Sequence, residues 1–210
     1  MAANKEGIIV ILSSPSGAGK TSLVKEISKK KNFSISISHT TRKPRSNEID
    51  GSDYFFVKKE KFKKLISKKK FLEYAKVFNN YYGSSKDVVF KKLNEGRDVI
   101  FDIDWQGTEQ IKQKKLKYTI ITIFILPPSR EELFSRLLNR DRNDEKNAKK
   151  RMKQFDKDVM HWKNYDLVTI NDNFKKCCNK IIKYINSKKN NKFEKYNKSQ
   201  IKNHVLGLLK

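Results

Sequence analysis

Ser14-Pro15-Ser16-Gly17-Ala18-Gly19-Lys20-Thr21 is the stretch that decides the fold. It follows an apolar run at residues 8–12 and precedes a segment in which apolar residues recur with helical spacing. A strand, a glycine-rich turn and a helix in this order are the parts of a phosphate-binding loop. The glycines let backbone N–H groups face an anion, and the positive end of the helix dipole lies at the same point. The stretch therefore predicts binding of the phosphates of a nucleoside triphosphate, with Lys20 on the β- and γ-phosphates and Thr21 beside Mg²⁺.

Ser14 occupies the position where the motif G-x-x-x-x-G-K-[ST] has its first glycine. A serine is tolerated there only when its φ is negative, because positive φ is unfavourable for residues with a side chain. We therefore expect a negative φ at Ser14.

The chain has 210 residues and carries 48 lysines and arginines against 23 acidic residues, a formal net charge of +25. This length suits one domain, or one core with inserted lobes. A positive field attracts anionic substrates, but the lysines are scattered along predicted helices without the interleaved aromatic residues of a nucleic-acid stacking surface. We interpret most of the charge as a solvated surface and expect no specific nucleic-acid partner.

No apolar run approaches the ~20 residues that span a bilayer, and residues 1–7 have no signal-peptide pattern. Cys177 and Cys178 are adjacent, which favours neither a disulfide nor, without further ligands at metal spacing, a zinc site. These features predict a cytoplasmic protein without membrane contact, and they leave open whether it is a monomer or a homo-oligomer.

Strands that alternate with helices predict an α/β fold with a parallel sheet covered on both faces. The segment 38–84 interrupts this alternation and is expected to form an inserted lobe. It contains a polar loop at 38–52, a strand at 53–57, a helix around 62–66, an extended segment at 71–78 and a turn at 79–83. Core strands are expected at 8–12, 99–104, 118–126 and 167–170, with a short alternating segment at 33–37. Helices are expected at 20–31, 88–96, 131–142, 148–163 and 174–185. The Lys/Asn-rich tail after residue 187 is expected to be either a docked helix or disordered.

Arg42 and Arg45 lie three residues apart in the inserted segment, in a loop stiffened by a proline. Arginine pairs bind phosphate through bidentate, charge-assisted hydrogen bonds. Tyr54 and Tyr82 can add hydroxyl donors, so these four side chains together predict a pocket for a monophosphate dianion.

Glu73 stands within an apolar segment, where a carboxylate needs a partner. Guanine presents two adjacent donors that one carboxylate can accept together, whereas adenine presents an acceptor at the same edge. Glu73 is therefore a candidate for reading guanine, and the alternative is a salt bridge to one of the many lysines.

The chain resembles bacterial-type guanylate kinases over about residues 7–186. The resemblance rests on the phosphate loop and on segments 36–45, 50–56, 80–84, 102–107, 127–129 and 166–172. It implies a P-loop NTPase three-layer core with a parallel sheet, an inserted mixed α/β GMP-binding lobe and a helical lid. It also implies the reaction ATP + GMP ⇌ ADP + GDP, with ATP and Mg²⁺ required.

The resemblance divides this single domain into parts. The core would comprise residues 1–37, 85–130 and 164–187, the GMP-binding lobe residues 38–84, and the lid residues 131–163. Residues 188–210 form a basic C-terminal tail outside the firm match.

The resemblance also assigns site residues. Those implied to hold GMP are Ser38, Arg42, Arg45, Tyr54, Glu73, Tyr82, Gly83, Ser84 and Asp104. Those implied for ATP are residues 14–21 together with Asn171, near the adenosine. The catalytic set is Lys20, Arg42, Arg136, Arg140, Arg151 and Asp102. Asp102, which would share one face of its strand with Asp104, joins Thr21 in the Mg²⁺ shell, either directly or through water.

Three other classes compete with this reading. A kinase for another nucleotide would lack the base-reading carboxylate at Glu73. A non-catalytic guanylate-kinase-like interaction protein would lose the phosphate loop that Lys20 and Thr21 complete. A basic nucleic-acid-binding protein would show steeply salt-dependent affinity.

Overall fold

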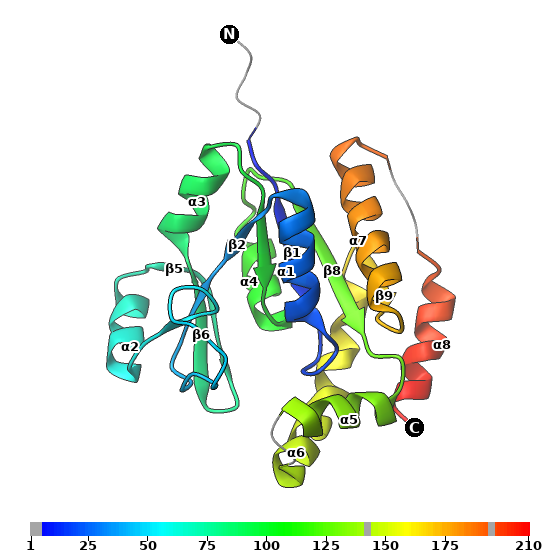
Figure 1. The fold of residues 1–210 in the computed structure, drawn as a ribbon. Helices are drawn as coiled ribbons and strands as arrows, with labels where there is room; N and C mark the ends of the chain where they lie inside the picture. The colour runs from blue at the N-terminus through cyan, green and yellow to red at the C-terminus, as the bar shows by residue number, and fades with distance from the viewer. Residues whose placement is uncertain (1–5, 141–143, 193–195) are drawn as a thin grey trace.

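The computed structural model describes residues 6–140, 144–192 and 196–210. Its centre is a five-stranded sheet with the order β2-β7-β1-β8-β9, in which every neighbouring pair is parallel (Figure 1). Its strands are β1 (Ile9–Ser13), β2 (Ser34–Ser36), β7 (Val99–Asp102), β8 (Ile120–Leu126) and β9 (Leu167–Ile170). All five residues of β1 are buried, as expected for a central strand that is covered on both faces.

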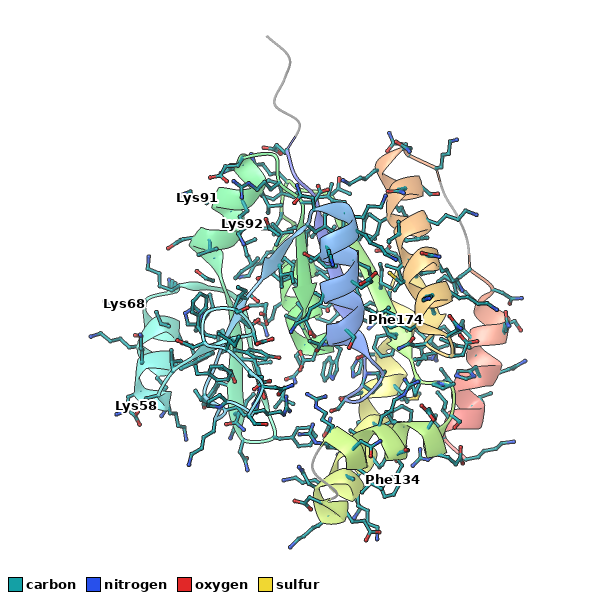
Figure 2. The ribbon with its side chains drawn as sticks, in the orientation of Figure 1. Lys58, Lys68, Lys91, Lys92, Phe134 and Phe174 are labelled. Carbon is teal, nitrogen blue, oxygen red and sulfur yellow. The ribbon has the colours of Figure 1, made fainter. Side chains whose placement is uncertain are left out.

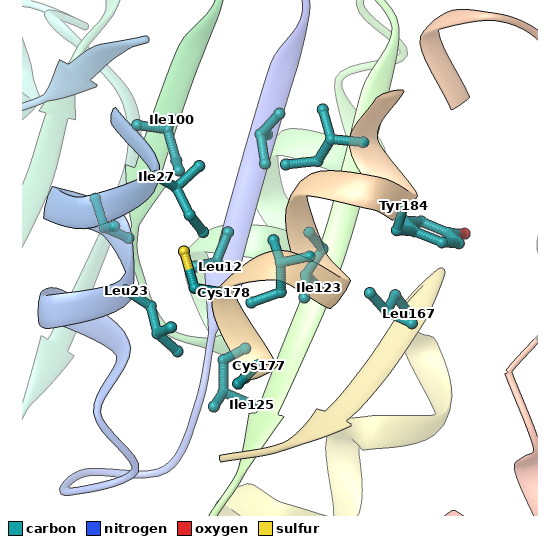
Figure 3. Close-up of a cluster of buried hydrophobic side chains, with 14 of the residues drawn as sticks. Leu12, Leu23, Ile27, Ile100, Ile123, Ile125, Leu167, Cys177, Cys178 and Tyr184 are labelled. Carbon is teal, nitrogen blue, oxygen red and sulfur yellow. The ribbon is translucent and has the colours of Figure 1, made fainter. Parts of the chain in front are cut away.

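Helices cover both faces of this sheet. One face carries α1 (Lys20–Lys31) and α7 (Phe174–Lys189), and the other carries α3 (Lys86–Asn94) and α4 (Trp105–Gln113). Figure 3 shows the first of these layers, in which Leu23 and Ile27 of α1 and Cys178 of α7 meet the sheet. Residues with alternate positions on β1 belong to different layers, so the pleat of the strand divides the core into two. The predicted α/β class is confirmed.

A second sheet forms what we call the small lobe, with the strand order β4-β3-β6-β5. Its elements are β3 (Ser38–Thr40), β4 (Phe55–Phe56), α2 (Lys59–Ser67), β5 (Phe71–Val77) and β6 (Asn80–Ser85). In Figure 1 this lobe lies to the left of the main sheet. β3 is parallel to β4 and antiparallel to β6, so the sheet is mixed.

Several predicted boundaries in the small lobe were wrong. Residues 38–40 were expected in a loop but form β3, and residues 80–83 were expected in a turn but belong to β6. The turn is confined to Phe78 and Asn79, because Val77 and Asn80 still pair across the hairpin. Of the strand predicted at 53–57, only Phe55–Phe56 is regular.

The helices after β8 also differ from the prediction. α5 (Arg130–Arg140) matches it closely, but the helix expected at 148–163 begins earlier, as α6 (Glu145–Asp158), and ends as the 3₁₀ helix η1 (Val159–Asn164). Asp144 caps α6 by accepting a hydrogen bond from the N–H of Asn147, which explains the earlier start. Residues 141–143 of the predicted link lie outside the described residues.

The tail contains a docked helix, which resolves the alternative that the sequence left open. α8 (Lys198–Leu208) buries Ile201, Val205 and Leu208 in the cluster formed by α5, α6 and the end of the main sheet. Arg130 at the start of α5 donates to the backbone carbonyl of Leu208 at 2.8 Å. These three apolar side chains of α8 therefore complete the core against which α5 and α6 pack.

The outer surface carries the excess positive charge. Lys58 and Lys68 are exposed at the two ends of α2, and Lys91 is exposed on α3 (Figure 2). Cys177 and Cys178 are free cysteines that are buried in the layer formed by α1, α7 and the sheet. Across the described ranges, no helix combines the length and apolarity that crossing a membrane requires.

Candidate active site

The phosphate loop joins the end of β1 to the start of α1. Gly17 and Gly19 have φ values of 92° and 91°, in the left-handed region that favours glycine. Ser14 does not have a positive φ, so the expectation for this departure from the motif is confirmed. A Cβ at Gly19 would lie 2.4 Å from Nδ2 of Asn171, so the absence of a side chain there also permits a close approach.

Asn171 lies directly after β9, which is separated from β1 by β8 in the sheet, and its side chain contacts the phosphate loop. Its amide nitrogen Nδ2 donates to the carbonyl oxygen of Ala18 at 2.9 Å, and the side chain is buried. Its backbone carbonyl accepts from Nη2 of Arg136 at 3.4 Å. Asn171 therefore links the phosphate loop to α5.

Lys20 and Asp102 face each other at the carboxyl ends of β1 and β7. Lys20 Nζ lies 2.8 Å from Asp102 Oδ1 and also donates to the carbonyl of Ile103 at 2.8 Å. Burial alone would raise the pKa of Asp102, but the Lys20 ammonium and the Thr21 hydroxyl outweigh that effect and hold this pKa below its ordinary value. Asp102 is therefore ionised at neutral pH.

Two of the predicted arginines meet on the phosphate loop from different helices. Arg151 of α6 donates to Oγ of Ser16 at 2.8 Å, and Arg140 of α5 lies 3.5 Å from the same atom. Arg136 instead pairs with Glu132 at 2.9 Å and reaches Asn171. All three lie on the side of the loop where α5 and α6 pack.

Arg42 and Arg45 of the small lobe share one carboxylate, that of Glu48. Glu48 Oε1 lies 2.8 Å from Nη2 of Arg42 and 3.0 Å from Nη1 of Arg45, and its Oε2 accepts from the Arg45 backbone N–H at 2.8 Å. The sequence interpretation missed Glu48. Its position three residues after Arg45, in a polar loop, was the available signal.

The guanidinium groups converge across the space between the small lobe and α5. Burial and the neighbouring Arg140 and Arg42 lower the pKa of Arg45. Like charges that approach in this way are unfavourable unless an anion lies between them. The space between Arg45 and Arg140 is therefore suited to a phosphate group.

Tyr54 and Tyr82 lie beside these arginines, as the sequence predicted. Their rings make an edge contact with centroids 6.0 Å apart, and the guanidinium of Arg42 lies 5.4 Å from the centroid of the Tyr54 ring. Burial, with the nearby Asp102 carboxylate, raises the pKa of Tyr54 far above its ordinary range. The phenol therefore stays protonated and can donate a hydrogen bond.

Glu73 lies at the other end of the small lobe and is 3% exposed. Its Oε1 accepts from the Ser84 hydroxyl at 2.6 Å, and Ser38 Oγ lies 3.3 Å from Ser84 Oγ. Because the Ser84 hydroxyl donates its only proton to Glu73, the Ser38 hydroxyl is the donor in its hydrogen bond with Ser84. No salt bridge within the described parts of the chain includes Glu73, so the lysine alternative finds no support.

The environment of Glu73 disfavours its charged form. Burial, and to a lesser degree the charge of Asp104, raise the pKa of Glu73 to about 7, although the Ser84 hydrogen bond acts in the opposite direction. Oε2 faces the start of α4, where a Cβ on Gly107 would lie 2.5 Å away. The small lobe and the core therefore meet at this carboxylate.

Asp104 does not share a strand face with Asp102, so that prediction was wrong. β7 ends at Asp102, and Asp104 is the N-cap of α4, where it accepts from the backbone N–H of Gly107 at 3.0 Å. Aspartate favours this capping position because its side chain replaces a missing backbone acceptor. Gly83, another predicted site residue, faces the rings of Phe62 and Phe71.

The site thus has two ends that differ in chemistry. One end combines a phosphate loop, Lys20, Asp102 and arginines from α5 and α6. The other combines an arginine and tyrosine pocket with a buried carboxyl group on the small lobe. Figure 1 shows the small lobe and the α5–α6 pair flanking the carboxyl end of β1, where the two ends meet. Within the described residues, no group of three or more His, Cys, Asp or Glu side chains forms a protein-only metal site.

Comparisons with known proteins agree on one family. Residues 6–188 match the family model described as guanylate kinase. A guanylate kinase of Rickettsia prowazekii (strain Madrid E) is 50% identical over 181 residues, which cover 86% of this chain and 91% of the relative. A guanylate kinase of Buchnera aphidicola subsp. Acyrthosiphon pisum (strain APS) is 43% identical over 199 residues, covering 93% and 95%.

A solved structure supports the same comparison. The crystal structure of guanylate kinase from Anaplasma phagocytophilum superposes with a TM-score of 0.67 at 31% identity, and the match covers 88% of this chain and 87% of that chain. The span matched by the family model contains every site residue described above and ends before α8.

Proposed function

The chain belongs to the guanylate kinase family, and we propose that this site transfers the γ-phosphoryl group of ATP to GMP or dGMP, giving ADP and GDP. The observation that carries this proposal is the pairing of a phosphate loop with a lobe that has a buried carboxyl group at one end and two arginines at the other. A loop alone supports only nucleotide binding. The second end supplies a monophosphate pocket and a base reader for the acceptor.

On the acceptor side, we assign the GMP phosphate to Arg42, Arg45, Tyr54 and Tyr82, and the guanine to Ser38, Glu73 and Ser84, with Asp104 nearby and Gly83 as a packing position. Glu73 can accept both guanine donors at once, and its hydrogen bond from Ser84 fixes its orientation. Adenine would present an acceptor to this carboxylate, a mismatch that buried polar sites reject strongly.

On the donor side, residues 14–21 would cradle the ATP phosphates, with Asn171 near the adenosine. Lys20 and the arginines Arg136, Arg140 and Arg151 would neutralise charge on the transferred group, while Arg42 and Arg45 aim the GMP oxygen. Phosphoryl transfer depends mainly on positioning and charge neutralisation, so no covalent intermediate is required. In this account residues 38–84 are the GMP lobe, 131–163 the lid, and 1–37, 85–130 and 164–187 the core. Residues 188–210 are an additional tail.

Mg²⁺ fits the donor side. Magnesium in phosphoryl-transfer sites takes one or two protein oxygens and completes its shell with water and substrate phosphates. The Asp102 carboxylate, which is held ionised, and the Thr21 hydroxyl beside it match that need. When bound, the ion would neutralise phosphate charge and orient the donor.

The nucleotides GMP and ATP are the partners that this account requires, and a cytoplasmic location suits both. A monomer or a homo-oligomer would serve equally well, because every site residue lies within one chain.

Glu48 gives a prediction about the acceptor pocket. We expect Glu48→Ala to raise the KM for GMP about tenfold, since it frees both arginines from their shared partner, and Glu48→Gln to raise it by about threefold or less, since the amide oxygen can still accept. Steady-state kinetics with GMP varied would measure both, with Glu60→Gln on α2 as a charge-matched control. A lower KM in Glu48→Ala would instead mean that Glu48 competes with the GMP phosphate.

The function itself is tested by a coupled assay for ADP release, with ATP, Mg²⁺ and each of GMP, dGMP, AMP, CMP and UMP. Turnover confined to the guanine nucleotides is expected. Similar turnover with all five would contradict the assignment of Glu73. No turnover with any of them would favour a non-catalytic binding protein, and salt-dependent binding to RNA and DNA would then be the next measurement.

A further inference from the structure

The tip of the β5–β6 hairpin has an unusual residue in its turn. Val77 pairs with Asn80, so only Phe78 and Asn79 connect the strands, and their φ values are 47° and 69°. Two consecutive positive φ values define a type I′ turn, which favours sequences such as Asn-Gly. A bulky aromatic residue in the left-handed region is a true outlier. Strain of this kind is retained where something else requires the side chain.

The Phe78 ring meets α6, which lies outside the small lobe. The guanidinium carbon of Arg151 lies 5.1 Å from its centroid, and Lys150 Nζ lies 5.9 Å from it. Both residues belong to α6. Cations at this range are attracted to the negative face of an aromatic ring, and arginine adds stacking of its planar group.

Otherwise the hairpin and α6 face each other across an open gap of about 430 Å³. Lys76, Phe78 and Asn79 line it from the hairpin, and Lys150, Lys153, Gln154 and Lys157 line it from α6. Four lysines that face one gap repel one another. The Phe78 ring thus makes an attractive contact beside four lysines that repel one another.

Arg151 carries this contact to the phosphate loop. The same guanidinium that lies beside Phe78 donates to Ser16 Oγ at 2.8 Å. Two side chains therefore connect the three parts: Phe78 links the small lobe to α6, and Arg151 links α6 to the phosphate loop. Phe78 itself touches no atom of the phosphate loop in any described contact, so its influence passes through Arg151.

We propose that Phe78 is a positioning residue for phosphoryl transfer, acting as a latch between the GMP lobe and the lid. By stacking on Arg151 it holds that guanidinium on the phosphate loop once the GMP lobe has closed, so that acceptor binding and charge neutralisation at the donor occur together. This inference rests on the proposed function and adds to it a residue outside the sets assigned to GMP and ATP.

The strain in the turn allows a specific test, because replacing Phe78 should change stability and activity in opposite directions. Glycine at position 78 suits the type I′ turn better than phenylalanine does, so Phe78→Gly should leave the melting temperature unchanged or higher. The same change removes the ring, so kcat should fall about tenfold. Phe78→Leu should lower kcat similarly, whereas Phe78→Tyr keeps an aromatic face and should retain kcat within about twofold. Asn79→Gly is the matched control, since it relieves the other positive φ of the turn and should leave kcat unchanged.

The test is steady-state kinetics with ATP and GMP on the full chain, alongside thermal unfolding of each variant. The latch predicts lower kcat with the KM for GMP within about twofold in Phe78→Gly and Phe78→Leu. It also predicts that Phe78→Leu has no further effect on kcat in an Arg151→Gln background, because coupled residues are not additive. Wild-type kcat in Phe78→Leu, an equal loss in Phe78→Tyr, a rise in KM alone, or additive effects with Arg151→Gln would each overturn the proposal. Failure of the proposed function differs from all of these, because the wild-type chain itself would then not phosphorylate GMP.

Discussion

Replacing Glu73 with glutamine is expected to lower kcat/KM for GMP by roughly 10³-fold. In the proposed assignment the buried carboxylate accepts two guanine donors, whereas the amide would accept only one and turn a donor toward the other. The ATP end of the site shares no side chain with this contact, so KM for ATP should change little. Steady-state kinetics with each substrate varied in turn measures both effects.

The raised pKa of Glu73 adds a pH signature to this variant. Its pKa is about 7 in the folded protein against an ordinary value of 4.5, so between these pH values the folded state binds more protons than the unfolded state. Stability of the nucleotide-free protein therefore falls as pH rises from about 4.5 to 7, by roughly 3 kcal/mol from this group. Glu73→Gln removes that penalty, so its melting temperature at pH 8 should equal or exceed that of the wild type.

Binding of GMP should show the opposite pH trend. The ionised carboxylate is the better acceptor, so affinity for GMP should fall as pH drops below about 7, and this dependence should vanish in Glu73→Gln. Calorimetric titration of GMP at pH 6 and pH 8 measures it, with Glu60→Gln as a control that should behave like the wild type. An unchanged kcat/KM for GMP in Glu73→Gln would show that this residue does not read the base.

Replacing Lys20 with methionine should lower kcat by roughly 10³-fold while KM for GMP changes little. The ammonium is the charge that the phosphate loop itself supplies, and methionine keeps most of the chain length without it. The loss should therefore appear in the chemical step and in ATP binding. Single-turnover measurement of ADP formation at saturating nucleotide separates the effect on the chemical step from the effect on ATP binding.

Asp102 supplies the control for the Lys20 variant. Removing Lys20 leaves a largely buried carboxylate that has lost its partner at 2.8 Å, so Lys20→Met alone should also lower the melting temperature. Adding Asp102→Asn should restore much of that stability but none of the kcat. Recovery of activity in the double variant would mean that Lys20 acts only by neutralising Asp102.

The strands of the main sheet could be predicted from the sequence because buried parallel strands appear as continuous apolar runs. β9 was predicted with its observed bounds, and the runs that became β1, β7 and β8 were also identified. The strands of the small lobe were harder to predict. β3 and β6 consist mainly of Ser, Thr, Tyr, Asn and Gly, and they become strands through pairing with each other rather than through an apolar pattern.

α4 was missed for a related reason, and with it the role of Asp104. The helix is short and contains Gly107 in its first turn, which weakens any helical pattern. The apolar run before it suggested that the strand continued to Asp104. Only the structure reveals that the chain turns after Asp102 and that the second aspartate caps a helix.

Individual candidate site residues could be named where a local motif contained them, but the contacts between them could not be predicted. Glu48 holds Arg42 and Arg45 together, and Phe78 meets Arg151 across 73 positions of sequence. Such pairs depend on where the lobes lie in space, which no local pattern encodes. The docked position of α8 likewise depended on a hydrophobic surface formed by α5 and α6.

Transfer from ATP to GMP can be followed directly by ³¹P NMR of a mixture of the protein, ATP, Mg²⁺ and GMP over time. ADP and GDP are expected to appear in equal amounts with little inorganic phosphate, because the charged side chains proposed to converge on the site would direct the phosphoryl group to the GMP oxygen. Inorganic phosphate accumulating in place of GDP would contradict this proposal, since the site would then hydrolyse ATP rather than transfer its phosphoryl group.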